Sequence, residues 1–202
     1  MIRIIKKPKE NKTITGTMSF EEFKNEIIKF RRSKKRSQEL INLETKIIAT
    51  GNARLAYTLA RLVKISDKER LEKVVLQSEN LLYCYLFARD INGADINSFS
   101  KIIVNSGDLE YNIWFARDIQ LKDPIMHEKV IIESNDPFYA YLYAREVPSA
   151  YIKPLEEIVV NSNDLDIIYW FYRDIKCANK VRLRCILRDT GYLDNIENEK
   201  HI

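Results

Sequence analysis

Residues 114–119 read WFARDI, and the chain writes nearly the same six residues three more times: LFARDI at 86–91, LYAREV at 142–147 and WFYRDI at 170–175. The arginines of these stretches are 28 residues apart, and one further step back reaches Arg61. Other columns keep the register: Ser78, Ser106, Ser134, Ser162, preceded by Thr50; Val75, Ile103, Ile131, Val159; and Phe87, Phe115, Tyr143, Phe171. Columns that stay in phase without an insertion predict a tandem repeat.

Each repeat divides into two short helices. Within 67–78, Leu71, Val74, Val75 and Ser78 have the i, i+3, i+4, i+7 spacing of one helix face. Residues that favour the N-cap precede the first helices at Asp67, Asp95 and Asp123, and the second helices at Asn80, Asp108, Asp136 and Asp164. Pro124 and Pro137 then suit the first helical position. Gly107, Asn135 and Asn163 suit the left-handed position that ends the first helix.

The β-branched segments KVVLQS, KIIVNS and EIVVNS leave a second interpretation open, in which they are strands of a horseshoe similar to leucine-rich repeats. Two helices are favoured because the apolar stripe extends back to Leu71 and caps fall at both ends. Neither helix can bury its apolar face alone, so repeats must stack. The prediction is an all-α protein, a right-handed α-solenoid of five repeats at 39–66, 67–94, 95–122, 123–150 and 151–178.

The SxDxxYxYxFARDIxGADI pattern resembles short tandem helical-repeat proteins of phages, giant viruses and low-GC bacteria. More broadly it is similar to HEAT-like and tetratricopeptide-like α-solenoids, over about residues 39–178. The resemblance implies a binding scaffold without chemistry of its own. For a viral protein it would imply an inhibitor of a host or defence protein.

The two ends differ from the repeats. Ser19 and Glu22 form a capping-box pattern, so a capping helix should begin at Phe20 within a basic segment, 1–38. KVRLRCILR at 180–188 predicts a closing helix within 179–202, followed by a tail.

The composition of the chain is that of a folded protein, and its charge is unevenly distributed. The chain has 202 residues, of which 46% are hydrophobic and 31% charged, as in folded soluble proteins. Its three cysteines lack metal-site spacing, no signal peptide begins the chain and no long apolar run occurs, so a cytoplasmic location without membrane contact is expected. Residues 1–64 carry 16 Lys and Arg against 6 Asp and Glu, whereas 65–202 carry 17 against 23. The basic end should meet an acidic partner, or the acidic remainder of another copy of the same chain.

The second helices carry the candidate partner-binding strip. On them, positions 84, 87, 88 and 91 should face the core and position 89 should face away. The strip comprises Tyr85, Arg89, Trp114, Arg117, Tyr141, Arg145, Tyr169, Trp170 and Arg173, with Leu86 and Leu142 beside them. Two interpretations stay open. Arginines that reach an acid of the next repeat would form a structural ladder, whereas free ones would contact another protein, because Tyr, Trp and Arg dominate binding hot spots.

Nucleic-acid binding is the alternative function. It would use the basic run Arg31, Arg32, Lys34, Lys35 and Arg36 within residues 24–36, with Tyr or Trp stacking on bases. Residues 65–174 hold 11 basic and 19 acidic residues, which should repel a duplex.

Enzymatic activity is not expected, and neither is a cofactor or a metal. No Gly-rich phosphate loop, catalytic triad or ligand cluster occurs, and His127 occupies an apolar column as a half-buried packing residue. Trp114, Asp118 and Arg145 resemble the residue set of HEAT-like alkylpurine DNA glycosylases. The pattern recurs at Trp170 and Asp174, so the repeat itself explains it.

Overall fold

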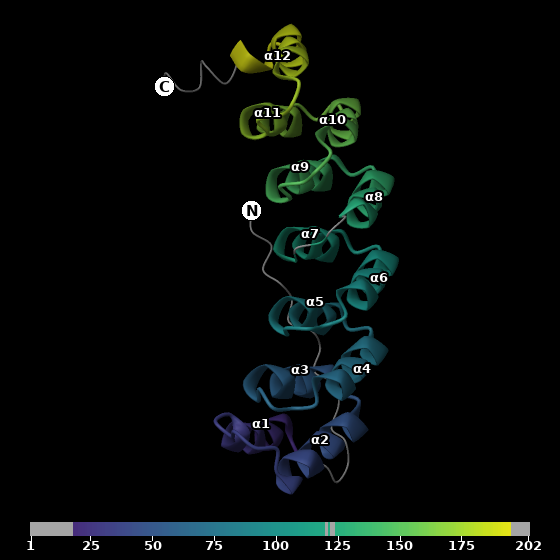
Figure 1. Cartoon of the computed structure of the whole chain (residues 1–202). Helices are drawn as coiled ribbons and strands as arrows, with labels where there is room; N and C mark the ends of the chain where they lie inside the picture. The colour runs from purple at the N-terminus through teal and green to yellow at the C-terminus, as the bar shows by residue number, and fades with distance from the viewer. Residues whose placement is uncertain (1–17, 120, 122–123, 195–202) are drawn as a thin grey trace. The chain divides into compact units, whose positions relative to one another are not determined.

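The computed structural model describes residues 18–119, 121 and 124–194, and over these residues the chain forms twelve α-helices of ten to thirteen residues and no strand (Figure 1). The all-α prediction is confirmed, and the strand interpretation is wrong. No helix of the described ranges has the length and apolar character needed to cross a membrane. Contacts divide the chain into two compact units, 1–78 and 79–202.

The first unit contains four described helices. They are α1 (Phe20–Phe30), α2 (Gln38–Thr50), α3 (Ala53–Leu62) and α4 (Lys68–Ser78). The Ser19 and Glu22 side chains form the predicted capping box, so α1 begins at Phe20 as expected. Helix α1 packs against α2 and α3 through the buried residues Phe23 and Ile27.

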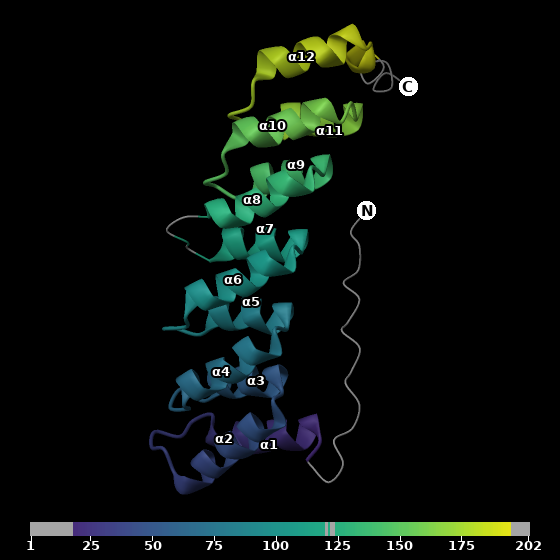
Figure 2. The same cartoon turned by 90° about the vertical axis from the view of Figure 1, so that its right-hand side faces the viewer.

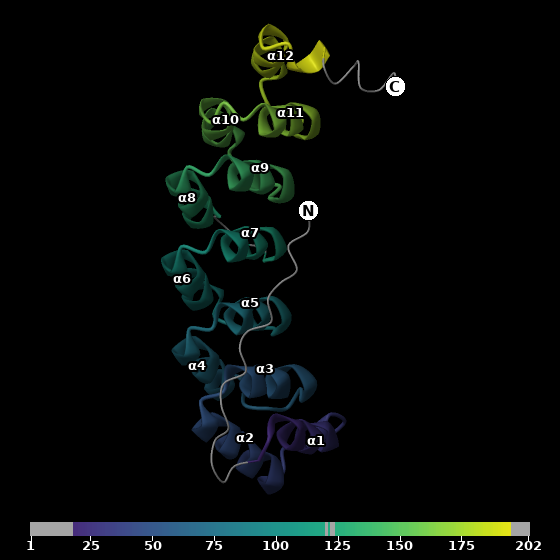
Figure 3. The ribbon, with the colours of Figure 1, turned by 180° about the vertical axis from the view of Figure 1, so that it is seen from behind.

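The second unit contains eight described helices. They are α5 (Leu81–Asp90), α6 (Ile96–Ser106), α7 (Leu109–Asp118), α8 (Ile125–Ser134), α9 (Pro137–Glu146), α10 (Ile152–Asn161), α11 (Leu165–Asp174) and α12 (Lys180–Asp189). Helices α5, α7, α9 and α11 pack on one another in order, and α6, α8 and α10 form a parallel row beside them (Figures 1 and 3). Turned by 90°, the unit shows its helices in layers, with their axes across the direction of stacking (Figure 2).

The helix ends explain several of the repeating columns. The side chains of Asn80, Asp108, Asp136 and Asp164 cap the second helices as predicted. Gly107, Asn135 and Asn163 have left-handed φ values of 67°, 51° and 56°. Each repeating serine donates to the carbonyl three residues earlier at 2.7 Å: Ser78, Ser106, Ser134 and Ser162. The serine column therefore closes the first helix of each repeat.

One predicted helix start is off by a residue. Pro124 is the N-cap of α8 rather than its first helical residue, because its carbonyl accepts from the N–H groups of both His127 and Glu128. Asp123, the predicted cap at this position, lies outside the described residues.

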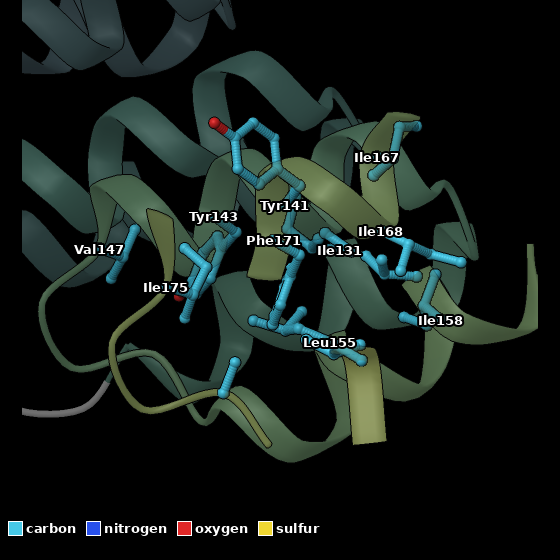
Figure 4. Close-up of a cluster of buried hydrophobic side chains, with 14 of the residues drawn as sticks. Ile131, Tyr141, Tyr143, Val147, Leu155, Ile158, Ile167, Ile168, Phe171 and Ile175 are labelled. Atoms are coloured by element: carbon cyan, nitrogen blue, oxygen red, sulfur yellow. The ribbon is translucent and has the colours of Figure 1, made fainter. Parts of the chain in front are cut away.

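The core of the second unit follows the predicted inward positions. Cys84, Phe87, Ala88 and Ile91 are all buried. In the later repeats Tyr143, Phe171 and their neighbours fill the space between the two rows of helices (Figure 4). The ring of Tyr141 lies at the edge of this cluster and its hydroxyl points away from it.

A column of buried glutamates, which the sequence analysis missed, joins successive first helices. Glu44 accepts from the backbone N–H of Asp67 at 2.8 Å, within the first unit. In the second unit Glu128 accepts from Tyr151 at 2.6 Å and Glu156 from Asn179 at 2.7 Å. Each glutamate thus accepts a hydrogen bond from the backbone N–H of the residue that precedes the first helix of the next repeat. The sequence does contain a sign of this column, because Glu44, Glu72, Glu128 and Glu156 occupy the same position of the 28-residue repeat.

Candidate functional site

The candidate strip lies on the stacked helices α5, α7, α9 and α11, where its polar groups form bonds between repeats. At the α5–α7 interface Arg89 donates to the hydroxyl of Tyr85 at 3.0 Å. That hydroxyl donates in turn to Asp118 of the next repeat. The tyrosine therefore relays a contact between an arginine and an acid 29 residues further along the chain.

The α7–α9 interface makes the same connection without the tyrosine. Ile113 occupies the position of Tyr85 and has no hydroxyl. Here Arg117 donates directly to Glu146 at 2.6 Å. Glu146 is one methylene longer than the aspartate found in this column elsewhere, and the added length spans the gap that the missing hydroxyl leaves.

The α9–α11 interface returns to the first pattern. Arg145 donates to the Tyr141 hydroxyl at 3.0 Å, and Tyr141 donates to Asp174 at 2.6 Å. Each arginine also pairs with the acid that follows it in sequence. The result is one hydrogen-bonded chain through four helices, which we call the polar ladder: Tyr85, Arg89, Asp90, Arg117, Asp118, Tyr141, Arg145, Glu146, Arg173 and Asp174.

The ladder keeps its groups in the protonation states that these bonds need. The neighbouring Arg117 lowers the pKa of Asp118, and Arg173 lowers the pKa of Asp174 to about 2. Burial raises the pKa of the Tyr85 and Tyr141 hydroxyls, so both remain protonated donors at neutral pH. The acids are charged acceptors there, which gives the stronger, charge-assisted form of hydrogen bond.

The structure divides the predicted partner-binding residues into three groups. Tyr85 and Tyr141 are buried, with 6% and 3% exposure, so they serve the ladder rather than an exposed surface. Arg89, Arg117, Arg145 and Arg173 are exposed but paired with acids, and Trp114, Tyr169 and Trp170 are half-buried. An arginine lies over the ring of the tyrosine four residues earlier at Arg89, Arg145 and Arg173, with guanidinium-to-ring distances of 5.0, 5.1 and 5.8 Å.

An outward face of apolar and aromatic groups lies beside the ladder. Leu86, Trp114, Leu142 and Trp170 occupy the same position of successive repeats, and Phe138 lies four residues before Leu142, on the same side of α9. Phe138, which the predicted strip does not include, is 43% exposed. We define the aromatic face as Leu86, Trp114, Phe138, Leu142 and Trp170, with the ladder arginines at its rim. Trp114 packs on Tyr85 and Tyr111 at ring distances of 6.0 and 5.1 Å, and Trp170 packs on Tyr141 at 5.9 Å.

His127 differs from its expected half-buried state, because it is fully buried and both ring nitrogens are hydrogen-bonded. Nδ1 lies 2.8 Å from the Asn112 side-chain oxygen and Nε2 lies 2.8 Å from the Ser100 hydroxyl. Asn112 itself donates to the carbonyls of Ile103 and Asp108. Asn112 and His127 thus each replace an apolar residue of the other repeats, and each provides the hydrogen-bond partner that the other needs when buried.

The basic run of the first unit is partly structural. Arg36 pairs with the buried Glu44 at 2.5 Å and with Asp67 at 3.2 Å. The other four residues, Arg31, Arg32, Lys34 and Lys35, are exposed, and none forms an ion pair with another described residue. Four of the five residues of the run therefore have no acidic partner among the residues that the structure describes.

Two groups of types used in catalysis, Asp118 and Cys84, have structural surroundings in this fold. Asp118, the acid of the glycosylase-like set, accepts from Tyr85 and Arg117. Burial raises the pKa of the Cys84 thiol to about 12, so it is not a nucleophile at neutral pH. Over the described ranges no three His, Cys, Asp or Glu side chains are grouped to hold a metal ion.

Comparisons with protein-family models, with curated proteins and with solved structures gave no match. The resemblance to viral and bacterial tandem repeats therefore remains an expectation from the sequence.

Proposed function

We propose that this protein is a non-catalytic binding scaffold: a right-handed α-solenoid of five two-helix repeats with a capping helix at each end. The helix bounds support this proposal, because helix pairs recur at the 28-residue spacing of the sequence motif. The packing of α5, α7, α9 and α11 in sequence order supports it as well. The partner is another protein, held on the aromatic face.

The observation that carries the proposal is a row of half-exposed aromatic side chains on helices joined by the polar ladder. Trp114 and Trp170 each rest on a buried tyrosine whose hydroxyl is fixed between two repeats. A surface held in place before binding loses little conformational entropy when a partner docks. Aromatic residues with arginine at their rim are also the residues that dominate protein-binding hot spots.

A cytoplasmic location is part of the proposal. The three cysteines are free thiols in the described residues, with Cys84 buried and Cys177 and Cys185 exposed, which suits a reducing compartment. In a virus-infected cell, occupation of a host or defence protein's surface would inhibit that protein.

The test is an affinity purification with the full chain as bait in lysate of its native host. We expect a stoichiometric protein partner whose recovery falls about tenfold or more with Phe138→Ala and Trp170→Ala together, because hot-spot truncations cost about 2 kcal/mol each. Met126→Ala with Val181→Ala is the matched control, since both side chains are exposed and apolar but lie outside the aromatic face. Equal recovery by the two variants, with unchanged melting temperatures, would contradict the proposed face.

Nucleic-acid binding through the first unit is the second candidate. Four exposed cations without a described acidic partner favour it, whereas Arg36 is held by Glu44 and Asp67. Neutralising Arg31, Arg32, Lys34 and Lys35 together should flatten the salt dependence of binding if phosphates are contacted. An unchanged slope would exclude this candidate.

A further inference from the structure

A cleft in the first unit brings together cations that are distant in the sequence. It has a volume of about 470 Å³ and is lined by Arg31, Tyr57, Thr58, Arg61, Leu62 and Lys64. Arg31 is the C-cap of α1, whereas Arg61 lies in the last turn of α3 and Lys64 follows that helix. The cleft is thus lined from the C-terminal ends of α1 and α3, two helices that pack against each other.

The charge of the cleft has one sign. Three of its six lining residues are basic and none is acidic. Arg31 and Lys64 form no ion pair with any other described residue, and Arg61 donates to the Tyr57 hydroxyl at 3.0 Å. Cations are favoured at the C-termini of helices, which explains a basic residue at the end of α1 and another at the end of α3. This preference does not explain why Arg31, Arg61 and Lys64 line the same cleft.

We propose that this cleft binds the phosphate group of a nucleotide-sized ligand. A phosphate carries up to two negative charges and three acceptor oxygens, so one group can satisfy several cations at once. Arginine matches it in a bidentate geometry. The volume lies within the range of about 300 to 1,000 Å³ typical of small-molecule sites, and the Tyr57 ring and Leu62 offer an apolar surface to the rest of the ligand.

This proposal does not rest on the aromatic face of the second unit. It also differs from diffuse attraction by the basic run, because it depends on Lys64, which lies outside that run, together with Arg31. The phosphate could belong to a free nucleotide or to a single strand of nucleic acid, and both offer the same group to the cleft.

The test compares two charge-matched variants of the full chain by titration with ATP and with a short oligothymidylate at one fixed low salt concentration. Arg31→Gln with Lys64→Gln removes two cations of the cleft. Lys34→Gln with Lys35→Gln removes two exposed cations outside it. We expect the cleft variant to weaken binding about tenfold or more and the control less than about threefold, since each charge-assisted hydrogen bond contributes on the order of a tenfold change.

The two probes distinguish the source of the phosphate. Binding of ATP that depends on the cleft identifies a free nucleotide, and dependence confined to the oligothymidylate identifies a strand. Lys64→Gln alone, outside any helix, should weaken binding in the same direction if the double variant fails to fold. Failure of both probes to bind, equal effects of the two double variants, or tighter cleft-dependent binding of polyglutamate would overturn the proposal.

Discussion

At Tyr85 and Tyr141 a single hydroxyl group joins the second helices of two successive repeats. Each hydroxyl accepts from an arginine of its own repeat and donates to an aspartate of the next. Because the bonds are partly buried and involve charged groups, their loss leaves polar groups without a replacement partner.

Tyr85→Phe and Tyr141→Phe should therefore each lower the free energy of unfolding by about 1 to 2 kcal/mol, measured by urea denaturation. Tyr111→Phe is the control, because this ring is half-buried in the same region but its hydroxyl has no hydrogen bond to a described residue. A loss of stability at Tyr111 as large as at Tyr85 would show that the rings, and not the hydroxyl bonds, carry the effect.

The tautomer of His127 follows from its neighbours. The amide nitrogen of Asn112 donates to two carbonyls, so its oxygen is the acceptor and His127 Nδ1 carries the proton. Nε2 then accepts from the Ser100 hydroxyl, and the ring is neutral. Burial favours this neutral form and lowers the pKa of His127 to about 4.

The buried histidine predicts acid sensitivity. An unfolded chain binds the His127 proton near pH 6.5, whereas the folded chain resists it until about pH 4. The free energy of unfolding is therefore unaffected by this group above pH 6.5, and it falls by about 3 kcal/mol in total as the pH is lowered toward 4. Asn112→Ala with His127→Leu, which restores residues found in these columns, should remove this part of the pH dependence. Stability profiles of the variant and the natural chain that run parallel between pH 7 and pH 4 would contradict it.

At the scale of elements, the α7–α9 interface differs from its neighbours by two linked substitutions. Ile113 replaces the relay tyrosine and Glu146 replaces the aspartate. Because Arg117 reaches Glu146 directly at 2.6 Å, shortening this acid by one methylene should break the bond.

Glu146→Asp should therefore destabilise the protein, and adding Ile113→Tyr should recover part of the loss by rebuilding the pattern of the α5–α7 and α9–α11 interfaces. In a double-mutant cycle measured by urea denaturation we expect a favourable coupling of about 0.5 to 2 kcal/mol. Coupling near zero would mean that the two columns are independent.

Element boundaries were predictable because local chemistry determines them. The caps Asn80, Asp108, Asp136 and Asp164 and the left-handed Gly107 and Asn135 act within a single turn, so their positions follow from the sequence alone. The Pro124 start was missed by one residue, because proline suits both the cap and the position after it.

For the whole molecule, the periodic sequence predicted which residues recur, but not which atoms meet. The ladder was one of two interpretations, and the relay through Tyr85 and Tyr141 could not be derived, since it depends on the spacing between stacked helices. The Asn112–His127 pair was missed for a related reason: each residue alone looks like a defect in an apolar column. The basic cleft joins Arg31 to Lys64, which no spacing in the sequence connects.

The central claim is that the recurring arginine is a connector between repeats. Arg117 bonds to an acid of its own repeat and to Glu146 of the next, whereas Arg173 pairs with Asp174 of its own repeat and is 56% exposed. The two arginines occupy equivalent positions in the motif, so the same substitution at each isolates the contact between repeats.

The most direct test is the melting temperature of Arg117→Gln beside that of Arg173→Gln. Arg117→Gln should lower it by about 2 to 4 °C, as expected for the loss of about 1 kcal/mol in a chain of this size. Arg173→Gln should leave it unchanged within error. Equal shifts for the two variants, or a larger shift at Arg173, would contradict the claim that this column joins the repeats.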